Sequence, residues 1–75
     1  MDDKVIEKLK KLGENIFKIR ESKNLTLAEL SARTEIKESF LKRIENGTAK
    51  RISVSHIYDI SDGLGVPPAE ICRGL

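Results

Sequence analysis

The chain has a single cysteine, Cys72, so no disulfide bond can form within it. It has one histidine, and its Cys and His residues do not form a cluster with the spacing of a zinc site. No apolar run approaches the roughly 18 residues of a membrane span, and the opening residues do not resemble a signal peptide. These absences exclude a disulfide framework and predict a cytoplasmic protein without a metal or cofactor.

The net charge is also small, because 14 basic side chains face 12 acidic ones and leave +2. This balance alone does not indicate a nucleic-acid partner. The distribution is more informative: residues 37–51 contain five basic and two acidic side chains, a local excess of +3. The 75 residues have room for one small domain, so we expect residues 1–75 to fold as a single unit.

Apolar residues recur at helical spacing in five segments, and no segment alternates as a β-strand would. The first helix is expected to start at Asp2 or Asp3, although Gly13 interrupts its apolar stripe at a cost of about 1 kcal/mol relative to alanine. We therefore distinguish an N-terminal helical extension, residues 1–11, from a core, residues 12–71. The expected helices span about 2–22, 26–34, 37–46, 53–65 and 67–71.

The second helix has the clearest start, because Thr26 is followed three residues later by Glu29, the spacing of a capping box. Asn24, just before it, suits the left-handed conformation that ends a helix. The fourth helix is expected to bury one apolar stripe. Its members are Val54, Ile57, Ile60 and Leu64.

Arg20 interrupts the apolar stripe of the first helix, four residues after Ile16. A buried guanidinium requires a carboxylate, because an unpaired buried charge costs several kcal/mol. Glu45, at the edge of the inward face of the third helix, is a candidate partner. Alternatively, Arg20 extends along its own aliphatic stem to reach water. Spacing alone leaves both interpretations open.

The third helix places Phe40, Leu41 and Ile44 on one face. Its other face is polar and has two interpretations. Glu38 and Lys42 are four residues apart, as in an ordinary exposed helix pair worth a few tenths of a kcal/mol. The alternative is a surface that contacts a partner.

Three stretches resemble the lambda-repressor-like helix-turn-helix domain of the Cro/repressor, or XRE, family. They are LGENIFKIRE at 12–21, LTLAELSARTEIKESFLKRIENG at 25–47 and LGVPPAEI at 64–71, within about four fifths of the chain. The resemblance implies an all-α fold of five helices whose third helix, at about 37–46, lies in the major groove of double-stranded DNA. It also implies an ion pair between Arg20 and Glu45.

The same resemblance assigns two sets of DNA contacts. Side chains expected at base edges are Lys37, Glu38, Ser39 and Arg43. Side chains expected at phosphates are Thr26, Asn46, Lys50 and Arg51. The implied function is a transcriptional regulator that binds a palindromic operator as a homodimer. We expect the contact between the two copies at the fifth helix, at the end of the fourth helix or at the N-terminal extension, with Val66, Ile71 and Leu75 as exposed apolar candidates.

Three positions depart from the family pattern. Leu27 replaces a glutamine that bonds a phosphate in many members, Glu35 replaces the glycine of the turn, and Lys37 offers no acceptor to cap the third helix. A different or strained turn is therefore expected. These features also occur in helix-turn-helix domains that bind proteins, such as that of the bacterial cell-shape anchor, so a protein-interaction module is the alternative function. An antitoxin-type regulator with a protein partner is another.

His56 lies near Ser53, Ser55 and Asp59, residue types that also occur in hydrolytic triads. Here they follow one another along a single short helix, so we expect a surface or interface histidine. The sequence does not predict an enzyme.

Overall fold

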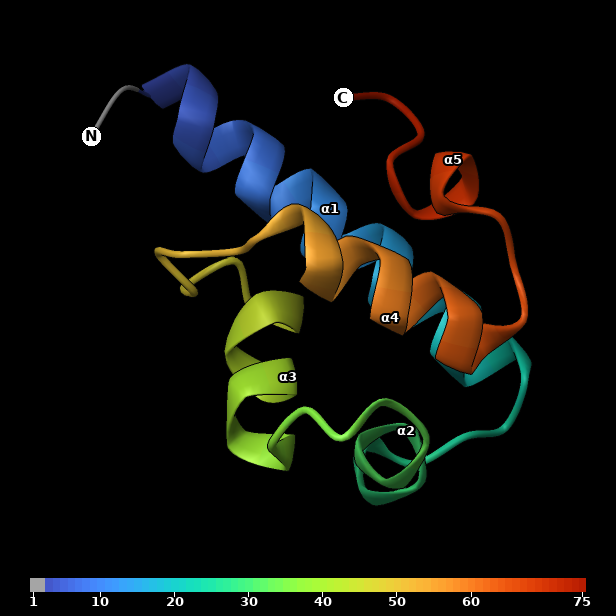
Figure 1. Ribbon diagram of the computed structural model, residues 1–75. Helices are drawn as coiled ribbons and strands as arrows, with labels where there is room; N and C mark the ends of the chain where they lie inside the picture. Colours follow the sequence, from blue (N-terminus) through green and yellow to red (C-terminus); the bar gives the residue numbers. More distant parts are fainter. Residues whose placement is uncertain (1–2) are drawn as a thin grey trace.

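The computed structural model describes residues 3–75 and, over that range, contains five helices and no β-strand (Figure 1). This is the predicted all-α fold, with helix bounds close to those expected. The alternative start of the first helix, Asp2, lies outside the described residues. No helix in the described range has the length and apolar character needed to span a membrane. The helices are α1 (Asp3–Ser22), α2 (Leu27–Thr34), α3 (Glu38–Glu45), α4 (Val54–Leu64) and α5 (Pro68–Ile71).

The five helices pack in a closed ring, in which α1 contacts α3 and α5, α2 contacts α3 and α4, and α4 contacts α5 (Figure 1). Every helix contributes at least one fully buried side chain to the centre of this ring. The position of α3 is therefore set by two neighbours, α1 and α2. The buried apolar side chains are Leu12, Ile16, Leu25, Leu30, Ile36, Leu41, Ile44, Ala49, Ile60, Leu64 and Ile71.

Helix α1 continues through Gly13 without a break. At this residue it crosses the end of α3. A Cβ atom at position 13 would collide with the carbonyl oxygen of Ile44 and would lie 2.6 Å from that of Glu45. Only glycine allows this close approach. Its low helix propensity is therefore the cost of bringing α1 against the last turn of α3.

Capping interactions define the start of α2 and of α4. As predicted, the Glu29 N–H donates to Thr26 Oγ1 (3.0 Å) and the Thr26 N–H donates to the Glu29 carboxylate (2.9 Å). The pKa of Glu29 lies below its ordinary value. The main cause is the hydrogen bond from the Thr26 backbone, and the second is the hydrogen bond with the Thr26 side chain. Asn24 is left-handed, with φ 56°, as expected for the end of α1.

The cap of α4 was not predicted. The His56 N–H donates to Ser53 Oγ (3.2 Å), and the Ser53 N–H donates to His56 Nδ1 (3.1 Å). His56 thus has the place that glutamate or glutamine usually has in a capping box. Its Nδ1 lone pair accepts a backbone N–H and does not face a serine hydroxyl.

Two predicted burial states are wrong. Val54 is 68% exposed, because the buried arc of α4 is centred on Ile60 and Leu64, about 100° away around the helix. Ile71 is fully buried, because α5 is a single turn that packs against both α1 and α4 and inserts its one large apolar side chain into the core. Of the other side chains expected at the surface, Val66 is half-buried and Leu75 is exposed.

The close approach at Gly13 leads to a prediction about stability. Replacing it by alanine should lower the free energy of unfolding by about 1–3 kcal/mol, because the added methyl group meets backbone atoms that cannot move aside. Alanine's higher helix propensity, worth about 1 kcal/mol, acts in the opposite direction. Urea unfolding measures the difference, with the exposed Lys18→Ala in the same helix as control. A Gly13→Ala protein more stable than wild type would contradict the packing described.

Candidate nucleic-acid interface

The outer face of α3 is exposed from end to end. Leu41 and Ile44 are buried and Phe40 is half-buried, so this helix is oriented with its polar residues toward solvent. Across residues 3–75, none of these polar side chains forms a hydrogen bond or ion pair, and the Glu38–Lys42 pair of the first interpretation is not formed. The face therefore holds charged and polar groups that are available to a partner. Its residues are Lys37, Glu38, Ser39, Lys42 and Arg43.

The predicted pair of Arg20 and Glu45 links α1 to the last residue of α3. Arg20 Nε lies 2.7 Å from Glu45 Oε2, and Nη2 lies 3.0 Å from Oε1. Only 8% of the arginine side chain and 6% of the glutamate side chain are exposed. The alternative in which Arg20 extends to water is not adopted. This bidentate ion pair fixes the end of α3 relative to α1.

Arg20 makes further contacts. Its Nη1 donates to the carbonyl oxygen of Leu25 (2.6 Å), in the connection to α2, and its guanidinium carbon lies 5.4 Å from the centre of the Phe17 ring. The hydrogen bond to Glu45 raises the pKa of Arg20, against the opposing effect of burial. A single guanidinium thus connects α1, the start of α2 and the end of α3.

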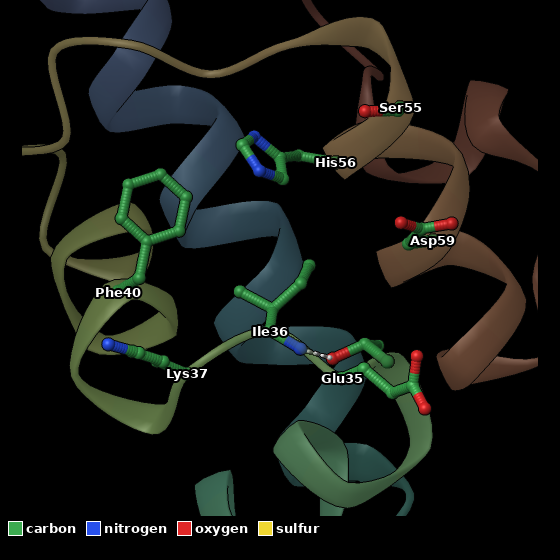
Figure 2. A pocket seen from close by; sticks show the side chains of 8 residues that line it. Glu35, Ile36, Lys37, Phe40, Ser55, His56 and Asp59 are labelled. Atoms are coloured by element: carbon green, nitrogen blue, oxygen red, sulfur yellow. Dashed lines mark hydrogen bonds between the residues drawn. The ribbon is translucent and has the colours of Figure 1, made fainter.

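The turn between α2 and α3 keeps a left-handed residue although glycine is missing. Glu35 has φ 61°, a conformation that costs a residue with a Cβ roughly 1–2 kcal/mol. Neighbouring side chains hold it: Thr34 Oγ1 accepts the Ile36 N–H (3.2 Å, Figure 2), and Ser31 Oγ donates to the Ile36 carbonyl (2.6 Å). The turn is therefore strained as predicted, and two hydroxyl groups from the last turn of α2 stabilise it.

Thr26, expected at a phosphate, is already engaged at the start of α2. Its backbone N–H and its hydroxyl oxygen both bond to Glu29, whose carboxylate also places a negative charge there. The amides of Leu27 and Ala28, in the first turn, have no partner within the helix. These two N–H groups are therefore better placed than Thr26 to meet an anion.

The other residues expected at phosphates lie in two places. Asn46 lines a hollow with Leu27, Lys42 and Phe17, on one side of the end of α3. Lys50 lines a second hollow, with Lys10 of α1, beyond Gly47. Arg51 is exposed in the same connection.

Lys10 was missed by the sequence analysis. It is one of several lysines in the first half of α1, and nothing in the residue spacing indicates that this lysine, and not a neighbour, lies beside the connection after α3. Only the packing of α1 across that connection reveals its position.

A third hollow lies behind the turn, between the start of α3 and α4 (Figure 2). The rings of Phe40 and His56 meet there, with centroids 5.0 Å apart and planes at 56°. Its titratable side chains are those of Glu35, Lys37, His56 and Asp59. Among the residues that the structure describes, no group of His, Cys, Asp and Glu is arranged to hold a metal ion. The contact between the Phe40 and His56 rings at this hollow links α3 to α4.

Comparisons with known proteins agree with this arrangement. A family model described as helix-turn-helix matches residues 16–71. Among solved structures, the chain is similar to the restriction-modification controller protein C.AhdI from Aeromonas hydrophila, with a TM-score of 0.80 and 24% identity over 84% of this chain and 94% of that one. At this identity the structural match establishes the fold. A search of curated proteins gives no match.

The buried pair leads to a second prediction. Glu45→Ala should lower the free energy of unfolding by about 3–5 kcal/mol, because the buried Arg20 guanidinium then keeps only the exposed carboxylate of Glu21, 3.4 Å from Nη1, as a counter-charge. Replacing both partners, as in Arg20→Met with Glu45→Leu, should cost less than the sum of the single changes. Urea unfolding of the wild type, Arg20→Met, Glu45→Leu and the double variant forms the cycle. Strictly additive losses would show that the two side chains do not depend on each other.

Proposed function

The chain belongs to the helix-turn-helix family, and on that basis we propose that it regulates transcription by binding double-stranded DNA at a specific sequence. The observation that carries this proposal is the outer face of α3. Its polar side chains are exposed and unpaired within the described range, while the helix beneath them is fixed at its end by Arg20 and Glu45. A rigid helix with free polar groups suits insertion into the major groove.

The residue types on this face match the chemistry of base edges. Arg43 has the two parallel donors that bind guanine O6 and N7, and Glu38 has the acceptors for cytosine N4. Ser39, one position later, serves as donor or acceptor. Lys37 adds a cation just before the first turn, where side chains reach most deeply into the groove.

Phosphate contacts flank α3 in this proposal. The free amides of Leu27 and Ala28 meet one phosphate at the start of α2, as helix N-termini do. Asn46, Lys50 and Arg51 meet others after α3. These contacts fix the register of the protein on the duplex and account for the salt dependence of binding.

One copy of α3 reaches only a few base pairs, so we propose that two copies bind with two-fold symmetry. Half-sites would then lie about 34 Å apart, one turn of the duplex. The longest dimension of this chain, 32 Å, is compatible with two adjacent copies at that spacing. Val54 and Tyr58, one turn apart on α4 and 68% and 58% exposed, offer an apolar surface for the contact between them.

A second candidate, a protein-interaction module, is supported by Phe17 and Leu27. Phe17 is 45% exposed, and the half-buried Leu27 lines the same hollow beside α3. These two apolar side chains, with the carboxylates of Glu14 and Glu45 in the same lining, suit a protein side chain better than a phosphate. Binding to this surface would not require Arg43.

Selection from a pool of random duplexes at about 100 mM salt tests the proposal, since non-specific phosphate binding is already weakened there. We expect enrichment of a palindrome bound by two chains. Arg43→Ala should cost about 1–3 kcal/mol of binding free energy and relax the preference at one position of each half-site. Arg73→Ala, at an exposed arginine paired with Glu70, is the control and should change neither.

Absence of enrichment, with binding that simply fades as salt rises, would contradict sequence-specific binding and favour the protein-interaction module. Enrichment of a single half-site, with a complex that sediments as one chain per duplex at high micromolar concentration, would contradict the two-fold arrangement alone.

A further inference from the structure

The first half of α1 lies alongside the connection between α3 and α4 (Figure 1). The contact is closest at Lys10 and Gly47. A Cβ atom on Gly47 would lie 2.9 Å from Lys10 Cγ and 3.0 Å from Lys10 Cα, and Gly47 is left-handed with φ 75°. The backbone of the connection is therefore seated directly against the stem of Lys10.

Together the two segments line one hollow with apolar and basic side chains. The apolar ones are Ile6, Leu9 and the buried Ala49, and the basic ones are the exposed Lys10 and Lys50. No carboxylate lines this hollow. In the described part of the chain, neither lysine side chain forms an ion pair or hydrogen bond.

The acidic residues nearest to Lys10 on α1 are three and four residues away and line other hollows, and neither forms an ion pair with it in the described range. Glu7 lines a hollow near the C-terminus with Lys8 and Lys11, and Glu14 lines the hollow beside Leu27 and Asn46. The positive charge of Lys10 is therefore not compensated by a direct partner within residues 3–75. Two cations that line one hollow, one of them packed against the backbone of Gly47, form a place for an anion.

We propose that Lys10 and Lys50 together bind a DNA backbone phosphate, a contact made from outside the helix-turn-helix motif itself. The inference rests on the proposed DNA binding and extends it to the N-terminal part of α1. This hollow shares no lining residue with the one that contains Asn46 and Leu27. Phosphate contacts at both places then fix the end of α3 against the backbone of the duplex.

Salt dependence of binding tests this contact directly, because each phosphate contact contributes about 0.9 to the slope of log K against log[salt]. The probe is a duplex of about 20 base pairs and mixed sequence, titrated between about 50 and 200 mM salt. Lys10→Gln should reduce the slope by about 0.9. Its loss of affinity relative to wild type should then be about threefold to fourfold larger at 50 mM than at 200 mM.

Lys8→Gln is the matched control. Lys8 is exposed in the same turn of α1 but lines the hollow near the C-terminus, so this variant changes the net charge equally without touching the proposed contact. Lys10→Arg keeps the cation and should keep the wild-type slope. Circular dichroism melting checks that all three variants fold.

Three outcomes would overturn the inference. Equal slopes for Lys10→Gln and Lys8→Gln, with wild-type binding intact, would refute the Lys10 contact and leave the proposed function standing. A Lys10→Arg variant that loses as much slope as Lys10→Gln would show that the lysine acts by packing and not by its charge. A wild-type protein without salt-dependent binding to any duplex would refute both the inference and the proposed function.

Discussion

The buried pair of Arg20 and Glu45 is the interaction on which the geometry of the surface depends. Helix α3 has eight residues, too few to be stable alone, so its orientation comes from its packing. Leu41 and Ile44 anchor its inner face in the core, and Glu45 fixes its end to α1 through two hydrogen bonds. Gly13 is required for this arrangement, because any side chain there would push α1 away from those carbonyls.

With its inner face and its end held in this way, α3 needs none of its outer side chains for stability. Those side chains make no hydrogen bond or ion pair in the described range, so the position of α3 is held by other residues. The strained residue of the preceding turn, Glu35, is likewise stabilised by the hydroxyl groups of two α2 residues, Ser31 and Thr34. The result is a rigid support for an outer face that is free to contact a partner, which is what the proposed DNA binding requires.

Local patterns in the sequence predicted local features of the structure well. The helix bounds, the cap at Thr26 and the left-handed Asn24 follow from residue types at short spacing. The Arg20–Glu45 pair was implied by the family resemblance, because the spacing of the residues alone left open an arginine that reaches water. The errors concern tertiary packing, that is, which face of a helix its neighbouring helices cover. Periodicity gave α4 an apolar stripe but could not show that Val54 lies beyond the ring of helices, or that Ile71 lies within it. The contact of Lys10 with Gly47 is of the same tertiary kind.

A titration of the ¹⁵N-labelled protein with a short mixed-sequence duplex at low salt tests the central claim most directly, because it maps the contact surface without knowledge of the operator. The account predicts the largest amide shifts at the start of α2, along the outer face of α3 and through residues 46–51. An unchanged spectrum, or shifts centred on α4, would contradict it.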